Sequence, residues 1–159
     1  MAVDKIEIVP AVDADAQPLA EISRRAFEHD VNYGAPGPCG PPGYDSPDWQ
    51  SEMIRSGRFF KVLERGRLVG GFVLFRLPDG SVEFGRAFLE PECQNRGIGG
   101  ELLDFAEGVF HDGARFVLDT PAWNLRTQHF YEKAGYVKTG EIDTGEGFSL
   151  FQYEKRLKA

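Results

Sequence analysis

Hydrophobic and polar positions change their period several times along the chain, and each change predicts a new element. Residues 5–9 (KIEIV) alternate, as in a half-buried strand. From about Asp15 to Phe27, apolar residues recur at helical spacing and predict an amphipathic helix. Three apolar runs then fill residues 59–89, separated by turn signals at 65–66 and 78–80. These runs predict an antiparallel meander of three strands.

A glycine- and proline-rich segment, residues 34–47, separates the first helix from the meander and predicts a loop. Ser46 followed by Pro47 is a helix start, because the hydroxyl can cap the first turn and proline presets φ at the first helical position. Gly57 is expected to end that short helix in a left-handed conformation.

After Leu89 the pattern alternates between strand and helix. The expected elements are a glycine loop with a helix at 98–111, a strand at 115–119, a helix at 124–134, and strands at 136–141 and 148–157. We find no internal repeat and no linker. The order predicts one domain of the mixed α/β (α+β) class, with helices on the faces of a mixed sheet.

Composition narrows the function classes. At 159 residues, with 42% hydrophobic and 27% charged residues, the chain is typical of one soluble domain. A net charge of −7 argues against a nucleic-acid partner, because such proteins carry basic patches. It is compatible with a cationic substrate, although many soluble proteins are acidic for solubility alone, which is the more ordinary explanation.

Cysteines and histidines are few and scattered: Cys39, Cys93, His29, His111 and His129. Their spacing matches no metal-ligand pattern, so we expect no metal site. The N-terminal residues lack a signal-peptide pattern, and no apolar run is long enough to span a bilayer. The sequence therefore predicts a cytoplasmic protein with reduced thiols and no membrane contact.

The glycine cluster is the most informative stretch. Gly97, Gly99 and Gly100 crowd the start of the helix that begins near Ile98. Free N–H groups and the helix dipole favour an anion there, and glycine lets a ligand approach the backbone closely. A tight turn would explain the cluster equally well. The segment lacks the Gly-Lys-Ser/Thr ending of a P-loop and the spacing of a dinucleotide fold.

Two segments carry a family resemblance. Gln94-Asn95-Arg96-Gly97-Ile98-Gly99 resembles the Q/R-x-x-G-x-G/A motif of the GNAT acetyltransferase superfamily. Residues 124–136 are similar to its second signature, N-x-x-A-x-x-F-Y-x-x-x-G-F/Y, with Thr127 in place of the usual alanine. Together with the C-terminal LFQYEKRL, the likeness covers almost the whole chain.

The resemblance implies a central, mixed and mostly antiparallel sheet of six to seven strands, flanked by helices on both faces, in a single domain over residues 1–159. It also implies an N-acetyltransferase in which a primary amine, small-molecule or peptide, attacks the thioester of acetyl-CoA directly in a ternary complex. The alternative is a catalytically idle acyl-CoA-binding sensor or subunit with the same fold.

The resemblance further implies which residues hold the coenzyme. The candidates are Phe88, Leu89, Gln94, Asn95, Arg96, Gly97, Ile98, Gly99, Gly100, Asn124 and Arg126. A β-bulge around Phe88 would turn backbone N–H groups toward the pantetheine arm and the thioester carbonyl. Asn124 could instead be a helix N-cap, and each arginine a solvated charge.

Two residues are candidates for the acid–base chemistry. Glu83 lies on the strand before the glycine loop, where many family members carry a glutamate, and partial burial would make it a better base. A solvent-facing role, or deprotonation through water, is the alternative. Tyr131 matches the tyrosine that faces the coenzyme sulfur and could protonate the leaving thiolate. Its alternative is a core aromatic.

Acceptor residues are less specific. His29, Tyr33 and Trp49 lie in the region that shapes the acceptor side in this superfamily, and their aromatic rings would suit a cationic amine. Ordinary helix and loop surface explains them as well. The last strands are candidates for a homodimer contact.

Overall fold

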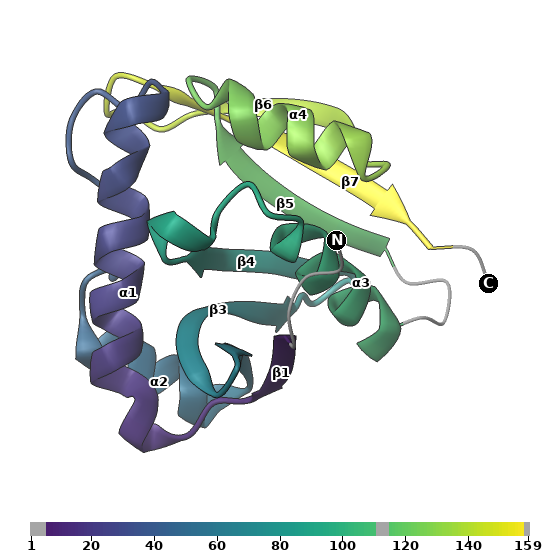
Figure 1. The fold of residues 1–159 in the computed structure, drawn as a ribbon. Helices are drawn as coiled ribbons and strands as arrows, with labels where there is room; N and C mark the ends of the chain where they lie inside the picture. Colours follow the sequence, from purple (N-terminus) through teal and green to yellow (C-terminus); the bar gives the residue numbers. More distant parts are fainter. Residues whose placement is uncertain (1–5, 111–114, 158–159) are drawn as a thin grey trace.

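Seven strands form one sheet in the computed structural model, which describes residues 6–110 and 115–157 (Figure 1). The strands are β1 (Ile6–Pro10), β2 (Arg58–Glu64), β3 (Arg67–Arg76), β4 (Val82–Leu89), β5 (Arg115–Pro121), β6 (Val137–Asp143) and β7 (Ser149–Arg156). Their order is β1-β2-β3-β4-β5-β7-β6. Of the strand pairs in the described part of the chain, only β4 and β5 run parallel. The predicted mixed, mostly antiparallel sheet and the predicted meander are confirmed.

Within residues 6–110 and 115–157, four α-helices and three short 3-10 helices connect the strands. They are η1 (Asp13–Asp15), α1 (Ala16–Glu28), η2 (His29–Tyr33), α2 (Pro47–Ser56), η3 (Pro91–Cys93), α3 (Ile98–Val109) and α4 (Leu125–Lys133). The N–H of Trp49 donates to Ser46 Oγ at 3.1 Å, so α2 begins as predicted. The prediction for Gly57 is wrong: its φ is 172°, because the chain passes directly from α2 into the extended β2. No helix in the described segments is both long and apolar enough to cross a bilayer.

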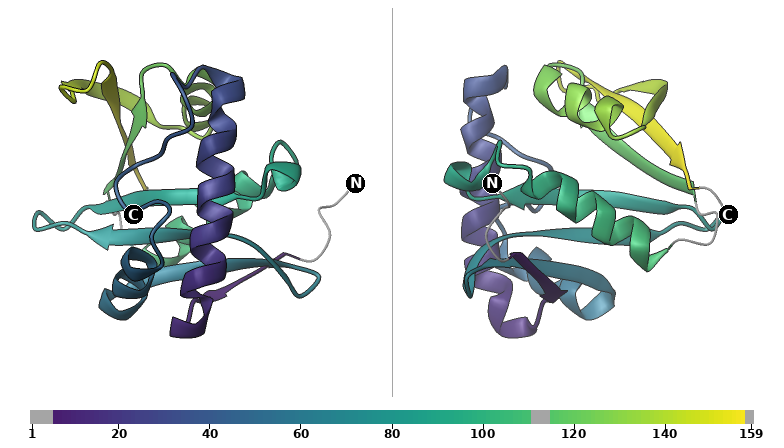
Figure 2. Two further views of the ribbon diagram at one scale, coloured as in Figure 1. Left: turned by 90° about the vertical axis from the view of Figure 1, so that its left-hand side faces the viewer. Right: turned by 45° about the vertical axis from the view of Figure 1, so that its right-hand side comes forward.

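Helices cover both faces of the sheet, as predicted (Figure 2). Alternating side chains of a strand point to opposite faces. One set, with Phe72, Val82 and Phe84, packs with α3 in a core that also holds Ile98 and Leu102. The other set packs with α1 and α2; its buried members include Leu19, Ile22, Phe59, Val73 and Phe88.

The sheet is interrupted where β4 meets β5. Among the described residues, their register covers only Val82 with Phe116 and Glu83 with Val117, and the two strands then diverge (Figure 1). β4 also has a bulge on its other edge, because Gly85 and Phe88 pair with β3 residues only two positions apart. Arg86 lies in this bulge with a left-handed φ of 53°. The bulge expected around Phe88 is therefore present, two residues earlier.

Candidate functional site

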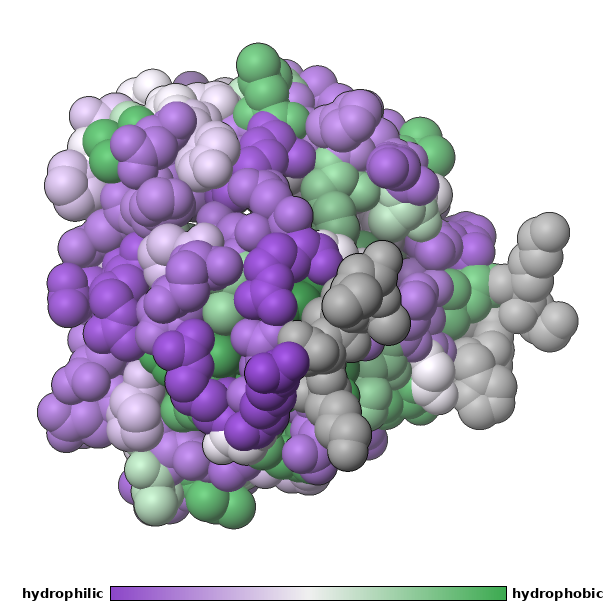
Figure 3. Space-filling view, viewed as in Figure 1, coloured by the Kyte–Doolittle hydropathy of each residue, from purple (hydrophilic) through white to green (hydrophobic). Residues whose placement is uncertain are grey.

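The gap between β4 and β5 begins at Glu83, the last residue of β4 that pairs with β5. Beyond it, β4 leads into η3 and the glycine loop, while β5 leads to α4. Figure 3 shows a narrow hollow in the mostly hydrophilic surface of this region. Elements from both halves of the sheet therefore surround one opening.

The glycine loop is shaped by two left-handed residues, Asn95 with φ 61° and Gly97 with φ 85°. Asparagine and glycine tolerate this conformation better than other residues. The side chain of Gln94 donates to the carbonyl oxygen of Leu89 at 3.1 Å and holds the loop against the end of β4. The Phe88 side chain is buried in the core, so only its backbone can face a ligand.

The first turn of α3 combines a packed side and an open side. Ile98 is fully buried, and a Cβ on Gly99 would lie 3.1 Å from the Phe130 ring of α4. A Cβ on Gly100 would meet nothing within 4 Å. Open space thus adjoins the N–H groups and positive dipole end of a twelve-residue helix. The predicted loop residues fit a diphosphate group on this ground.

Arg126, near the start of α4, connects both sides of the opening. Its guanidinium donates to Gln94 Oε1 at 2.7 Å and to Asp30 Oδ1 at 3.0 Å. It also lies 3.8 Å from the centre of the Tyr33 ring, against which His29 packs. Burial raises the pKa of Asp30, and Arg126 opposes the shift. The structure therefore joins His29 and Tyr33, predicted for the acceptor, to residues predicted for the coenzyme.

Asn124 is almost fully buried and caps α4, since its side-chain oxygen accepts from the N–H of Thr127 at 3.2 Å. The Thr127 hydroxyl in turn bonds Thr120 on β5 at 2.5 Å. This contact gives the family-atypical threonine a structural reason. The capping role of Asn124 is present, and contact with the coenzyme stays a prediction.

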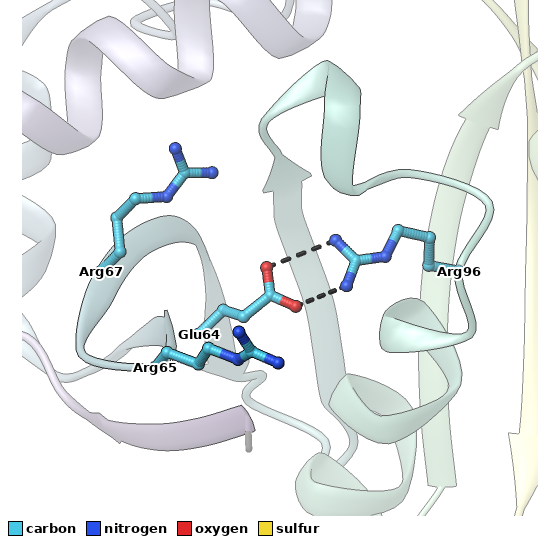
Figure 4. Close-up of a pocket in the computed structure, with 4 residues that line it drawn as sticks. All are labelled: Glu64, Arg65, Arg67 and Arg96. Atoms are coloured by element: carbon cyan, nitrogen blue, oxygen red, sulfur yellow. Dashed lines mark hydrogen bonds and ion pairs between the residues drawn. The ribbon is translucent and has the colours of Figure 1, made fainter. Parts of the chain in front are cut away.

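Arg96 forms an ion pair with Glu64 and lines an open hollow of about 440 Å³ with Arg65 and Arg67 (Figure 4). These residues come from the β2–β3 turn and the glycine loop. Three arginines and one glutamate leave a net positive charge beside the loop. The hollow therefore extends the positively charged surface away from the gap between β4 and β5.

Glu83 belongs to a half-buried charged cluster on the face of the sheet that α1 and α2 cover. Val82 and Phe84 point to the α3 core, so Glu83 points the opposite way. Burial raises the pKa of Glu83, Asp119 raises it further, and Arg86 lowers it. Asp119 is an exposed residue, but its carboxyl is partly enclosed, and this burial raises its pKa too.

Trp49 contacts this cluster rather than Tyr33. The Arg86 guanidinium lies 4.3 Å from the centre of the Trp49 ring. A Cβ on Gly43 would come within 2.5 Å of that ring, so the glycine-rich loop is in close contact with the indole. The three predicted acceptor residues are thus divided between two places.

Tyr131 lies on α4 beside Phe130 and Tyr136, with ring centres 5.1 Å and 5.7 Å away. Burial raises its pKa to about 12. The phenol therefore stays protonated at neutral pH and can donate a proton or a hydrogen bond. Its aromatic contacts fit the alternative prediction, that Tyr131 is a packed core residue. Packing through the ring and proton donation through the hydroxyl are compatible roles.

Sequence reasoning missed Arg86 and Asp119. Arg86 lies within the apolar strand pattern FGRAFL, and Asp119 ends the pattern RFVLD. A charged residue in such a pattern was the signal in the sequence that could have identified them. Within the described residues, no three His, Cys, Asp or Glu side chains form a group that could hold a metal ion.

Comparisons with known proteins agree with this architecture. The model of the acetyltransferase (GNAT) family matches residues 18–136. S-(2-succino)cysteine N-acetyltransferase from Bacillus subtilis is 28% identical over 162 residues, covering 93% of this chain and 94% of that protein.

Solved structures show the same fold. A GNAT acetyltransferase from Streptococcus agalactiae superposes with a TM-score of 0.81 at 17% identity, covering 99% of both chains. The PaiA N-acetyltransferase from Thermoplasma acidophilum, solved in complex with coenzyme A, superposes with a TM-score of 0.76 at 23% identity. That match covers 96% of this chain and 99% of the other.

Proposed function

Because the chain belongs to the GNAT acetyltransferase family, we propose that it transfers the acetyl group of acetyl-CoA to the nitrogen of a primary amine. It is an N-acetyltransferase, as is its Bacillus subtilis relative, whose name specifies an amino-acid derivative as acceptor. The observation that carries the proposal is the gap between β4 and β5, with Glu83 where the strands part and a glycine-rich helix start beside it.

Coenzyme A would lie with its diphosphate at the first turn of α3 and its pantetheine arm in the gap. The open space at Gly100 and the left-handed residues Asn95 and Gly97 support the diphosphate position. Coenzyme A is also the ligand in the Thermoplasma acidophilum structure. The co-substrate supplies the thioester, and the chain binds it, orients it and handles the protons.

The acetyl transfer needs three things from the protein. The amine must lose its proton, and Glu83 would accept it directly or through water, since its raised pKa makes it a stronger base than an exposed carboxylate. As the amine nitrogen bonds to the carbonyl carbon, negative charge grows on the oxygen, which a backbone N–H near Leu89 would stabilise. When the carbon–sulfur bond breaks, Tyr131 would donate its proton to the departing thiolate.

Calorimetric titration of acetyl-CoA into the pure protein tests the proposal, with coenzyme A and ATP as controls. We expect micromolar binding for both coenzyme forms and none for ATP, followed by thiol release in the presence of an amine. Binding without thiol release from a broad amine panel would favour the idle acyl-CoA sensor. No binding of acetyl-CoA at millimolar concentration would overturn both readings.

Two further expectations belong to the same proposal. A homodimer through β6 is supported by the exposed apolar residues Val137 and Ile142 on this edge strand, and size-exclusion chromatography at two concentrations would test it. A cytosolic location is supported by two cysteines that form no disulfide, Cys39 and Cys93.

A further inference from the structure

Arg86 is a half-buried cation that interacts with the Glu83 carboxylate only at longer range than an ion pair. Among the described residues, its guanidinium forms no ion pair, and its buried Nη1 has no hydrogen-bond acceptor. Arg25, Arg115 and Arg126 behave differently, since each reaches a carboxylate within 3.0 Å. A buried donor on a charged group is costly when it is left unsatisfied. An unsatisfied group of this kind calls for an explanation, and a ligand that pairs with the partly exposed part of the guanidinium is one.

The position of this guanidinium is fixed by its surroundings. Arg86 occupies the bulge with φ 53°, a conformation that non-glycine residues adopt at a cost in backbone strain. Its guanidinium packs over Trp49 at 4.3 Å, and the loop at Gly43 allows no larger residue beside that indole. The cation is therefore held in place by local structure.

Arg86 also lies on the acceptor side of the gap. It interacts electrostatically with Glu83, three positions earlier on β4, and Glu83 in turn interacts with Asp119. Three strand positions correspond to roughly 10 Å along the backbone, which one small molecule can span between two side chains. A positive and a negative group therefore lie near each other on β4, within the reach of one small molecule.

We propose that Arg86 binds a carboxylate of the acceptor, so that the natural acceptor is an amino-acid-type molecule carrying a primary amine and a nearby carboxylate. The inference rests on the proposed acetyltransferase function and adds the substrate class to it. The amine would face Glu83 and Asp119, and the carboxylate would pair with the guanidinium, whose planar fork suits a bidentate contact. An acceptor without the carboxylate would leave the half-buried guanidinium without a counter-charge, which is a basis for discrimination.

The test is acetylation of a panel of L-α-amino acids, each paired with its own carboxamide, together with polyamines and aromatic amines. The wild-type protein should prefer the acids by about 10- to 100-fold in kcat/KM, the range expected for a hydrogen-bonded charge pair. In Arg86→Asn this preference should disappear, mainly through a higher KM for the acids. Asparagine tolerates the left-handed backbone, so this variant should fold.

Arg86→Lys keeps the charge but loses the planar fork, so it should retain part of the preference. Arg55→Asn removes an exposed arginine of α2 and should leave the preference intact. Unchanged affinity for acetyl-CoA and a near-native Tm in all three variants would show that the effect lies in acceptor binding.

Several results would overturn the inference while the acetyltransferase function stands. One is equal use of acids and carboxamides by the wild type. Another is acetylation confined to amines without a carboxylate. A third is a lower Tm of Arg86→Asn with an unchanged preference, which would make Arg86 a packing residue. Acetyl-CoA binding with no acetylation of any panel member would instead contradict both the inference and the transferase function, in favour of the acyl-CoA sensor. Failure to bind acetyl-CoA would instead contradict the function itself.

Discussion

The two sides of the gap between β4 and β5 are built in different ways. The site proposed for the coenzyme diphosphate consists mainly of backbone: a loop with left-handed Asn95 and Gly97, and the N-terminus of α3. The proposed acceptor side consists of side chains from three separate segments, namely Glu83 and Arg86 on β4, Asp119 on β5 and Trp49 on α2. A site built from backbone groups suits a ligand that stays the same, because backbone N–H groups do not depend on residue type. A site built from side chains can bind a different ligand after an amino-acid substitution. Variants on the two sides should therefore have separable effects.

The largest expected effect is on the acceptor side. Glu83→Gln should lower kcat by about 10²- to 10⁴-fold, the usual contribution of a general base. Because the base must be deprotonated, wild-type activity should rise with pH through the raised pKa of Glu83, and the variant should lack this acidic limb. Steady-state kinetics across pH would measure both.

Acetyl-CoA affinity should stay unchanged in Glu83→Gln, which calorimetry can check. A wild-type pH profile with normal turnover would remove Glu83 from the mechanism and leave deprotonation through water.

Tyr131→Phe tests the coenzyme side at the point of chemistry. Loss of the phenol should lower kcat by about 10²-fold, because the thiolate would leave without a proton donor. The substitution keeps the ring contacts with Phe130 and Tyr136, so Tm should change little. Rates with a better thiol leaving group should be affected less. Undiminished turnover would make Tyr131 a packing residue only.

Gly100→Ala tests the backbone site without straining the protein. A Cβ there meets nothing within 4 Å, and alanine favours a helix by up to about 1 kcal/mol, so Tm should stay equal or rise. If the diphosphate occupies this space, acetyl-CoA affinity should fall about tenfold or more, as expected when a charged hydrogen bond is lost.

Gly108→Ala is the matched control, since it makes the same change near the other end of α3, also with open space around the added Cβ. Equal affinities in both variants would contradict the proposed position of the diphosphate.

The smallest expected effect comes from Asp119→Asn. Asp119 raises the pKa of Glu83, so the pKa of Glu83 should be lower in the variant. The acidic limb of the pH–rate profile should therefore move to lower pH. The pKa of Asp119 itself is raised, which means that the folded state holds the proton more tightly than the unfolded state. Its charge therefore costs stability above the unfolded pKa, and removing it should raise Tm at about pH 7 but not at about pH 3. A lower Tm at neutral pH would contradict this sign.

The difference between a site built from neighbouring residues and one assembled from distant segments also explains what the sequence could predict. The loop around Gly97 and the cap at Ser46 depend on neighbouring residues, so local patterns identify them. Arg126 was identified from its motif, but its contacts with Asp30 and Gln94 join segments far apart in the chain. Gly57 failed as a left-handed terminus because the next strand, not the helix, sets its conformation.

Arg86 shows the limit most clearly. Its left-handed φ comes from the register between β3 and β4, and its orientation comes from an indole 37 positions earlier. Neither is encoded near residue 86. Substrate-side residues of this kind can be found only once strands are paired, because a single charge in an apolar run has many structural explanations.

The two-residue ladder between β4 and β5 has a mechanical consequence. So short a ladder divides the sheet into two halves, β1 to β4 and β5 to β6, whose backbones pair only at Val82–Glu83 among the described residues. Beyond this ladder, the halves are connected by side chains: a shared core that holds Phe84 and Phe116, and the hydrogen bonds of Arg126. A ligand bound between the two halves of the sheet would therefore stabilise both halves at once. When the ligand is bound, backbone amide hydrogens in both halves should exchange with solvent more slowly than in the free protein. This slowing should include amides that do not contact the ligand.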